Sequence, residues 1–459
     1  MAKIVLIGGN HSGIAATNTI LGNYPENELV VIDRNTNLSY LGCGTALWIG
    51  RQIQSYDSLF YTSKDELERK GAKFHMETEV ERIDFVNKVV YLSHKSGAKT
   101  EERYDKLILA TGSNPIIPRI PGIDLENVEY VKLFQDGQKI DAALDSADIK
   151  RVAVVGAGYI GVEIAEAIKR RGKEPLLFET FDTCLATYYD PWFTHDMDKN
   201  LTDNGVELHF GERLNSIEGE GGKVCGVTTD KGSYAVELVI LAIGFRPNAA
   251  LGKEHLKLFD NGAYLVDRRQ QTSDPDVLAA GDCATIWSNA TEQDAYIALA
   301  TNAVRSGIVA GHNAGAAGAA GAAGADGAAA AVESPGVQGS NGICIFDYKM
   351  VSTGLNLAGA QKAGFDAAYT EYEDLQKPGF IEKENYKVKI RIIYDKKSRR
   401  ILGAQMASYQ DISMGIHMFS LAIAEKLTIE KLALLDIFFL PHFNQPYNYI
   451  TMAAISAKD

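Results

Sequence analysis

Two stretches of this chain show the same order of features: an apolar strand, a glycine-rich turn, a helix and a second strand that ends in an acidic residue. The first runs from Lys3 to Asp33 and the second from Arg151 to Glu179. This order is typical of a unit that binds a dinucleotide, because the turn brings backbone N–H groups to a pyrophosphate and the acid accepts hydrogen bonds from a ribose. The chain is therefore predicted to be an α/β protein with two Rossmann-like dinucleotide-binding domains.

The first glycine-rich turn has the sequence GGNHSG. Gly8 permits the tight turn, Gly13 permits close packing of the helix, and Asp33 is placed to accept a hydrogen bond from a ribose hydroxyl. Asn10 stands at the place of the usual middle glycine, so its side chain must point away from the pyrophosphate or contact it. His11 follows in the loop that faces the ligand, where an imidazole can act as an acid or base; a structural hydrogen bond is the alternative.

The second turn, GAGYIG, has all three glycines, Gly156, Gly158 and Gly161. Glu179 at the end of the following strand is predicted to bind the adenosine ribose and to repel an extra phosphate there, which favours NADH over NADPH. Three basic residues precede that strand and would soften the preference if their loop folded back onto the nucleotide: Arg170, Arg171 and Lys173.

Cys43 lies between two glycines in the stretch LSYLGCGTALWIG, just before the helix-compatible run Thr45–Ile49. A thiol at a helix start is expected to ionise more easily because of the helix dipole, and the thiolate is the reactive form. The alternative is a small buried hydrophobic residue. The remaining cysteines are widely spaced and form no CxxC pair, which argues against a disulfide framework and against a zinc site: Cys184, Cys225, Cys283 and Cys344.

The 459 residues carry a formal net charge of -13 and no long basic run, which argues against nucleic acid or an anionic membrane surface as a partner. No apolar run reaches about 18 residues, and the chain passes from Met1 directly into an apolar strand, so neither a membrane span nor secretion is expected. About three domains are expected at this length. These features predict a cytoplasmic protein.

Further strand and turn signals follow each of the two dinucleotide units. A charged helix is predicted over Ser63–Lys70, followed by strands through Val80 and over Val89–Leu92. The segments YDKLILATGSNP at Tyr104–Pro115 and ELVILAIGFRPN at Glu237–Asn248 are apolar strands followed by glycine turns. They are typical of the points where a chain leaves a nucleotide-binding domain.

The segment TSDPDVLAAGDCA predicts a short strand that delivers Asp282, followed by a helix over Tyr296–Val309. An acid at a strand end can hold a ribityl hydroxyl, and a helix start can face an electron-rich ring. The alternative to such a binding role is that this segment is an ordinary strand, turn and helix.

Between Ala314 and Ala331 every residue except Asp326 is alanine or glycine, which predicts a flexible surface linker because frequent glycine lowers helix stability. The segment Val337–Asp459 is predicted to mix strands with helices and has no nucleotide motif, which indicates an interface role.

The two dinucleotide units, the ATG strand, the GD strand and the mixed C-terminal segment occur in an order that resembles the flavoprotein disulfide reductases over nearly the whole chain. Six segments are similar to the NADH oxidase and NADH peroxidase branch: GGNHSG, LSYLGCGTALWIG, GAGYIGVE, YYDPWF, GVQGSNG and FFLPHFNQPYNYITMAA. The resemblance implies an FAD-binding domain in residues 1–115 and 247–330, an NAD-binding domain in 116–246 and a C-terminal α+β dimerisation domain in 331–459, in a homodimer.

The resemblance also implies the roles of individual residues. Cys43 is implied as the redox residue that cycles between thiolate and sulfenic acid, with His11 as the neighbouring acid or base. Glutathione- and lipoamide-type reductases carry a second cysteine five residues after the first, where this chain has Trp48. FAD contacts are implied at Gly8, Asn10, Gly13, Asp33, Val80, Ala110, Ser113, Lys132, Asp282, Ala298, Leu299 and Ala300. NADH contacts are implied at Tyr159, Ile160, Glu179, Tyr188 and Gly244, beside the glycines Gly156, Gly158 and Gly161.

Three further side chains take roles from the same resemblance. The Tyr159 ring can cover the flavin until NADH displaces it, and Glu163 either steadies the nicotinamide amide or supports local packing. The partner chain of a dimer lines the flavin pocket in this family, which makes His442 and Phe443 candidates across the interface.

The implied activity is an NADH oxidase that reduces dioxygen to water with four electrons from two NADH, through FAD and Cys43. An NADH peroxidase would share every motif and differ in keeping dioxygen from the flavin. A coenzyme A-disulfide reductase would use Cys43 in a mixed disulfide. A non-enzymatic NADH-binding flavoprotein is a more remote alternative, because it would not need Cys43.

Overall fold

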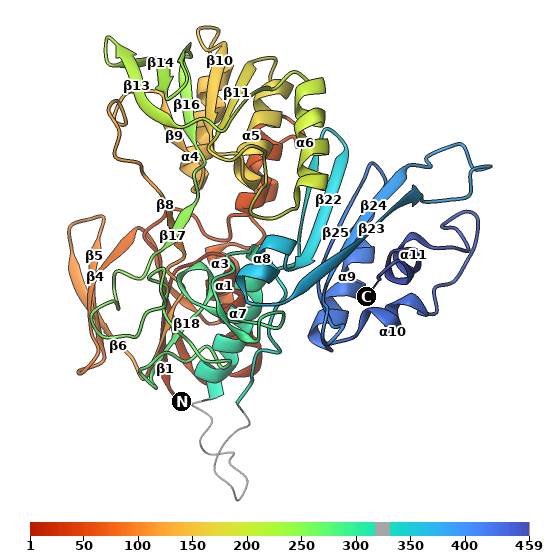
Figure 1. The fold of residues 1–459 in the computed structure, drawn as a ribbon. Helices are drawn as coiled ribbons and strands as arrows, with labels where there is room; N and C mark the ends of the chain where they lie inside the picture. The colour runs from red at the N-terminus through yellow and green to blue at the C-terminus, as the bar shows by residue number, and fades with distance from the viewer. Residues whose placement is uncertain (317–330, 459) are drawn as a thin grey trace, which may run out of the picture.

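A five-stranded parallel sheet, with the order β18-β7-β1-β2-β3, forms the centre of the first lobe, at the bottom of Figure 1. The computed structural model describes residues 1–316 and 331–458. The strands of this sheet are β1 (Lys3–Ile7), β2 (Glu28–Ile32), β3 (Lys73–His75), β7 (Lys106–Leu109) and β18 (Val277–Ala279).

Both faces of this first sheet are buried, as is usual for parallel sheets. Ile4 and Leu6 face the helices α1 (His11–Asn23) and α7 (Ala300–Gly315). Val5 and Ile7 face a core shared with the antiparallel sheet of β4 (Thr78–Asp84), β5 (Val89–His94) and β6 (Lys99–Arg103). This alternation explains why the strand reads as a continuous apolar run.

The second lobe, at the top of Figure 1, is built on a second parallel sheet with the order β12-β11-β10-β16-β9. Its strands are β9 (Val128–Tyr130), β10 (Arg151–Val155), β11 (Glu174–Glu179), β12 (Glu207–Phe210) and β16 (Leu238–Leu241). The helices α4 (Phe134–Asp145), α5 (Tyr159–Arg170) and α6 (Pro191–Asp203) cover one face. The strands β13 (Leu214–Glu220), β14 (Lys223–Thr229) and β15 (Ser233–Ala235) cover the other. The antiparallel pair β8 (Ser113–Pro115) and β17 (Phe245–Pro247) connects the two lobes.

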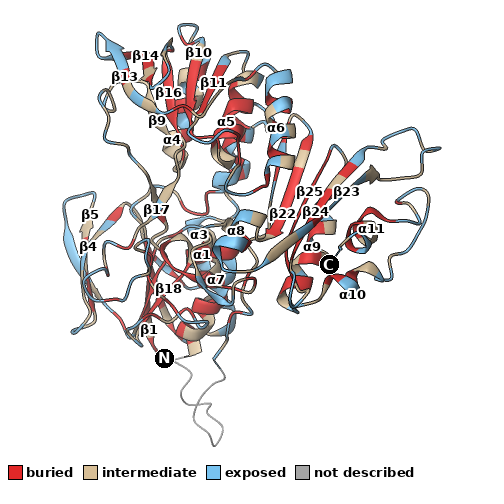
Figure 2. Cartoon of the chain, in the orientation of Figure 1, coloured by how far each residue is buried: buried red, intermediate tan, exposed pale blue. Residues whose placement is uncertain are grey.

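The third lobe contains an antiparallel sheet with the order β21-β22-β25-β24-β23. Its strands are β21 (Asn341–Ile345), β22 (Tyr348–Gly354), β23 (Ala367–Leu375), β24 (Lys387–Asp395) and β25 (Ile401–Ser408). Its helices are α8 (Leu357–Lys362), α9 (Ser413–Ala424), α10 (Ile429–Ala433) and α11 (Tyr449–Ile455). Buried residues follow β22 and β25 closely (Figure 2).

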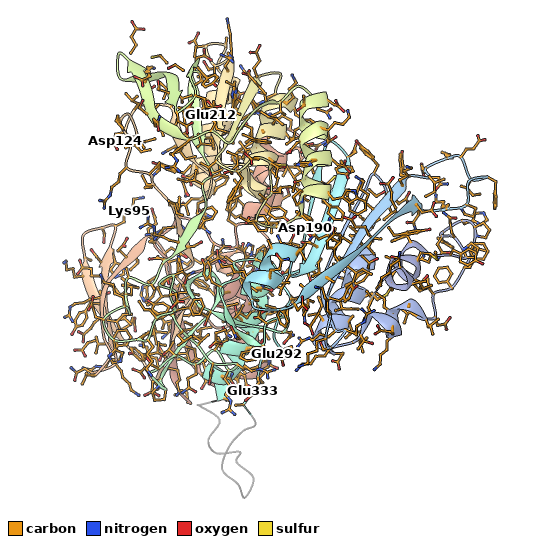
Figure 3. The ribbon with its side chains drawn as sticks, in the orientation of Figure 1. Lys95, Asp124, Asp190, Glu212, Glu292 and Glu333 are labelled. Carbon is orange, nitrogen blue, oxygen red and sulfur yellow. The ribbon has the colours of Figure 1, made fainter. Side chains whose placement is uncertain are left out.

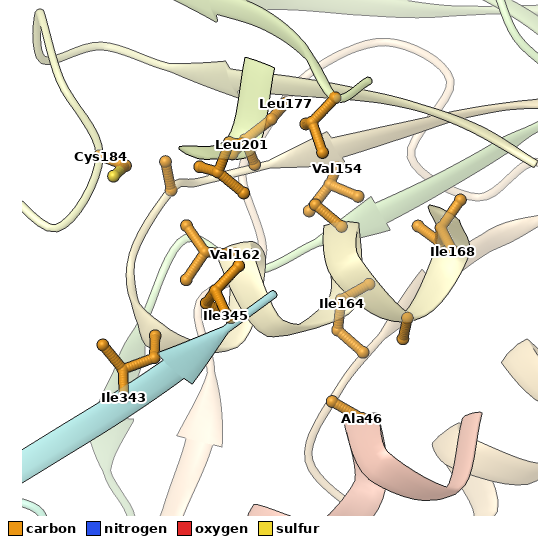
Figure 4. Packing of buried hydrophobic residues seen from close by; sticks show 14 of the residues in the cluster. Ala46, Val154, Val162, Ile164, Ile168, Leu177, Cys184, Leu201, Ile343 and Ile345 are labelled. Carbon is orange, nitrogen blue, oxygen red and sulfur yellow. The ribbon is translucent and has the colours of Figure 1, made fainter. Parts of the chain in front are cut away.

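The third lobe packs firmly against the second. Ile343 and Ile345 of β21 join the core around α5, as does Ala46 of the short helix α2 (Thr45–Ile49) from the first lobe (Figure 4). Asp190, at the start of α6, lies at the same junction in Figure 3 and pairs with Arg391 at 2.8 Å. These contacts hold elements of all three lobes around α5.

The remaining short elements are the 3-10 turns η1 (Gly42–Gly44), η2 (Tyr56–Leu59) and η3 (Gly281–Cys283), the helix α3 (Lys64–Arg69), and the strand pair β19 (Ile286–Ser288) and β20 (Gln293–Ala295). The predicted α/β class with two Rossmann-like units and a C-terminal α+β unit is confirmed. Among the described residues, none forms a helix long and apolar enough to cross a membrane.

Two predicted boundaries near α7 are wrong. The helix begins at Ala300 rather than Tyr296, because the chain stays extended through β20 and the Tyr296 hydroxyl donates to the Asp282 carbonyl at 3.0 Å. The linker predicted from Ala314 begins later, because the final residues of α7 pack on the first lobe, where Asn27 donates to the Gly315 carbonyl at 2.8 Å. Residues 317–330 of that linker lie outside the described residues.

Candidate active site

The two glycine-rich turns have the same backbone geometry. Gly8 has φ 112°, and a Cβ there would lie 2.1 Å from the carbonyl oxygen of Ala110; Gly156 has φ 101°. A Cβ on Gly13 would lie 1.8 Å from the carbonyl oxygen of Gly8, and one on Gly161 would lie 1.7 Å from that of Gly156. Only glycine fits these places, so both turns bring backbone close to the space above the strand ends.

The acid that ends the second strand of each unit is tied to its own turn. Asp33 accepts a 2.6 Å hydrogen bond from the N–H of Gly9, and Glu179 accepts one of 2.8 Å from the N–H of Ala157. Burial raises the pKa of Asp33, partly offset by backbone N–H donors. Each carboxylate is thus held beside the turn, where a ribose is expected.

The helices α1, α5 and α7 begin without a side-chain cap, as do several other helices of the described chain. The N-cap residues are Asn10 for α1, Gly158 for α5 and Leu299 for α7, and none of their side chains accepts a hydrogen bond from the first turn. The first N–H groups of such helices remain available to an anion or an electron-rich group. Asn10 therefore leaves the start of α1 open, and both turns have a geometry that can receive a phosphate group.

A charged cluster joins the second lobe to the first, because Lys132 lies between β9 and α4. Lys132 donates to the Ser113 hydroxyl at 2.8 Å and lies 3.3 Å from an Asp282 oxygen, and Ser113 donates to the same oxygen at 2.9 Å. The start of α7, which has no side-chain cap, follows Asp282 along the chain. Ala298 and Ala300 lie on either side of its N-cap residue, Leu299. Val80 lies apart, in β4, half-buried against the core below the first sheet.

His11 is the first residue of α1. Its Nδ1 lies 3.1 Å from the Tyr61 hydroxyl, and the two rings are stacked. Burial lowers the pKa of the imidazole, and Asp282 partly offsets that effect. Tyr61 was not predicted, because it lies far from His11 in sequence and in no motif.

Cys43 opens into a cavity of about 330 Å³ where the three lobes meet. The cavity is lined from η1, α2, α5, β21, β22 and the start of α9 by Cys43, Ala46, Leu47, Gln52, Glu163, Glu166, Gly342, Ile343, Cys344, Lys349, Val351, Asp411 and Ser413. Of these, the residues from the third lobe were not predicted as part of the site, because no sequence signal pairs β21 with α2. All five cysteines are free thiols.

Two expectations about Cys43 are wrong. Its side chain is exposed, so the small buried residue considered as an alternative does not apply. The pKa of the Cys43 thiol is raised rather than lowered. The larger cause is the partial burial of the thiol in this cavity, and the next is the Glu163 carboxylate. The short α2 begins two residues later and does not outweigh these effects.

Glu163 faces this cavity from α5. Burial, and secondarily the Glu166 carboxylate, raise the pKa of Glu163 to about 7. Within the described part of the chain, its carboxylate makes no hydrogen bond or ion pair. Glu166 is held instead, since its Oε1 accepts from the N–H of Phe346 at 2.9 Å and from Arg170 at 2.8 Å.

Aromatic side chains surround the start of α5. The Tyr159 hydroxyl is hydrogen-bonded to that of Tyr189 at 2.9 Å and to Asn341, and the Tyr188 ring packs edge-on against Tyr159 at 4.6 Å. Ile160 follows on the helix. Gly244, with φ 100°, directly precedes β17.

The other predicted residues lie elsewhere. His442 and Phe443 are exposed on the third lobe, and neither is among the residues that line the cavity of Cys43. The basic residues before β11 are bound elsewhere: Arg170 by Glu166, Arg171 by Asp141, and Lys173 by the carbonyls of Ser146 and Ile149. They do not face Glu179.

Residues 2–307 match the family model of the pyridine nucleotide-disulphide oxidoreductases, and residues 340–448 match the dimerisation domain of the same family. The chain is 57% identical to NADH oxidase from Lactococcus lactis subsp. cremoris over 99% of this chain and 100% of that one. It is also 57% identical to NADH oxidase from Streptococcus pyogenes over the full length of both. The structure of a water-forming NADH oxidase from Lactobacillus brevis bound to NADH superposes with a TM-score of 0.93 at 36% identity, covering 99% of this chain and 98% of that one. This chain therefore belongs to the pyridine nucleotide-disulphide oxidoreductase family.

Proposed function

We propose that this protein is an FAD-dependent NADH oxidase that reduces dioxygen to water with the electrons of two NADH. The observation that carries the proposal is the exposed thiol of Cys43 in a cavity between three lobes, with Trp48 at the sequence position where a disulfide partner would stand. A second exposed thiol, Cys344, lines the same cavity from the third lobe. The similarity to full-length NADH oxidases supports the same activity.

The first unit is proposed to bind FAD. The open start of α1 would contact the pyrophosphate, and Asp33 would bind the adenosine ribose. Asp282 and the start of α7 would contact the ribityl chain and the ring end of the cofactor. FAD, when bound, supplies the redox centre between NADH and dioxygen. In the second unit Glu179 holds the adenosine ribose of NADH, and Tyr159 covers the nicotinamide position.

Cys43 is proposed to remove peroxide before it escapes. Its thiolate takes one oxygen atom from hydrogen peroxide, the O–O bond breaks, and a sulfenic acid remains at Cys43 while the other oxygen leaves as water. His11 relays a proton from solvent to the departing oxygen, so that it leaves as water. A neutral imidazole suits this relay, in line with the lowered pKa of His11.

The working assembly is proposed to be a homodimer. The match of residues 340–448 to a dimerisation domain supports it. Phe443, 57% exposed, and the neighbouring His442 are proposed to reach the cofactor of the other subunit. A cytoplasmic location is proposed because all five cysteines are free thiols, as in a reducing compartment.

The test is the stoichiometry of the purified yellow protein, measured with an oxygen electrode and NADH absorbance. Two NADH consumed per dioxygen, without detectable peroxide, is the expected result. One NADH per dioxygen with accumulation of peroxide contradicts water formation. Activity only with added peroxide, or only with a coenzyme A disulfide, assigns the protein to the corresponding related reductase instead.

A further inference from the structure

We propose that Glu163 donates the proton that leaves in water when oxidised Cys43 is reduced. This inference rests on the proposed function, because it concerns the same thiol. It assigns Glu163 a catalytic role distinct from holding the nicotinamide amide.

Glu163 and Cys43 line the same cavity from opposite elements, α5 and η1. α5 and α2 pack closely, since Ala46 joins the core beneath α5 (Figure 4). Glu163 has no hydrogen bond or ion pair within the described chain, whereas Glu166, one turn later, is bound by Arg170 and the N–H of Phe346. Glu163 is thus the carboxyl group of the pair that can exchange a proton with a group in the cavity.

The other charged groups that face this cavity are already bound. Lys349 of β22 donates to the carbonyls of Asp347 and Tyr409, both at 2.9 Å. Asp411 accepts from the N–H of Ser413 at 3.0 Å, and the hydrogen bonds from Ser413 lower its pKa, so it is ionised at neutral pH.

Two uncharged but titratable groups, one in the cavity lining and one at the start of α5, do not compete for this role. The thiol of Cys344 in β21 also lines the cavity, and burial raises its pKa. Tyr159 is held by Tyr189, and burial raises its pKa well above the ordinary value. Burial and Glu166 bring the pKa of Glu163 to about 7, the range in which a carboxyl group both donates and regains a proton at neutral pH.

Reduction of the Cys43 sulfenic acid uses two electrons that NADH supplies and that FAD, when bound, would carry. The S–O bond breaks, and a thiolate remains at Cys43. The hydroxide that departs takes the proton of the Glu163 carboxyl group and becomes water. The Glu163 carboxylate then regains the proton released when NADH is oxidised. His11 is less suited to this step, because its lowered pKa leaves it neutral and a weak donor at pH 7.

The experiment compares the parent holoenzyme with the Glu163→Gln variant. Glutamine keeps the size of the side chain and can still hydrogen-bond to an amide, but it has no carboxyl proton to donate. Asp411→Asn is the matched control, because it changes a charge in the same cavity at an ionised residue outside the proposed step. During turnover, a sulfenic-acid-trapping reagent and mass spectrometry of the Cys43 peptide report the oxidised fraction. Glu163→Gln is expected to raise this fraction several-fold, while Asp411→Asn and the parent agree.

A second readout needs no turnover. The pH dependence of Cys43 alkylation by iodoacetamide, measured on the reduced holoenzyme without oxygen, reports the thiol pKa. Because the Glu163 carboxylate raises that pKa, Glu163→Gln is expected to move the midpoint down by at least about half a pH unit.

Three outcomes would contradict the proposed role of Glu163. An unchanged sulfenic acid fraction in Glu163→Gln overturns the proposal, even if the KM for NADH rises, since that pattern indicates nicotinamide binding alone. An unchanged alkylation midpoint overturns the placement of the carboxylate beside the thiol. If the parent itself traps no sulfenic acid, the proposed Cys43 chemistry fails, and the Glu163 step fails with it.

Discussion

Glu179 accepts a 2.8 Å hydrogen bond from the N–H of Ala157, so the acid and the glycine-rich turn of the second unit are fixed to each other. Its other oxygen accepts from the N–H and the hydroxyl of Thr180, at 2.6 and 2.9 Å. The Thr180 hydroxyl can rotate away and make room for a ribose hydroxyl. A phosphate at the same place would meet a carboxylate that the backbone holds in position.

This geometry predicts that the protein uses NADPH at least tenfold less efficiently than NADH, a difference of about 1.4 kcal/mol. Glu179→Ala removes the repulsion and is expected to raise kcat/KM for NADPH. Glu174→Ala, at the exposed start of the same strand, is the control and should leave the ratio unchanged. Equal efficiencies with the two nucleotides in the parent would contradict the ribose assignment.

Cys43→Ser is expected to keep NADH oxidation and to release hydrogen peroxide, because no thiolate remains to reduce it. The measurement is a peroxide assay beside oxygen consumption. Cys225→Ser is the control, since Cys225 is also exposed but lies on β14, away from the cavity. Water as the only product of Cys43→Ser would contradict the sulfenic acid mechanism.

His11→Ala is expected to slow turnover by about tenfold or more and to let some peroxide escape. Because burial lowers the pKa of His11, the imidazole becomes charged only at a more acidic pH than an ordinary imidazole, and activity of the parent should fall there. That acid limb should vanish in His11→Ala. Tyr61→Phe, which removes the contact to Nδ1, is expected to show a smaller loss; unchanged rate and product in His11→Ala would leave His11 a structural role.

Asp190→Ala is expected to destabilise the junction of the second and third lobes. Asp190 and Arg391 are both buried, and Asp190 also accepts from Gln405 at 2.8 Å, so its loss leaves a buried cation short of a partner. Such a loss costs about 3 kcal/mol or more, visible as a lower thermal midpoint. Asp366→Ala breaks the exposed pair with Lys396 and should change the midpoint little. Equal shifts in the two variants would contradict this role.

The strand-turn-helix units were predictable because their signals are local. Apolar runs such as Lys3–Ile7 and Arg151–Val155 form the central strands of the two parallel sheets, and the family predicted from the motif order is confirmed. The boundaries of the domains and the roles of the individual site residues stay predictions. The start of α7 was missed, because the hydrogen bond from Tyr296 to the Asp282 backbone is a tertiary contact with no sequence pattern.

By itself, the sequence determined the fold class and the two nucleotide units, since both follow from residues close together in the chain. The role of Cys43 stays a prediction from the same local signals. Only the tertiary structure decided the surroundings of that thiol. Glu163 and Lys349 come to its cavity from other lobes, and the pKa of Cys43 is raised where local helix geometry alone predicted a lower one. The physical reason is that burial and charge act through space, so the proton affinity of a group depends on whichever distant residues the fold packs around it.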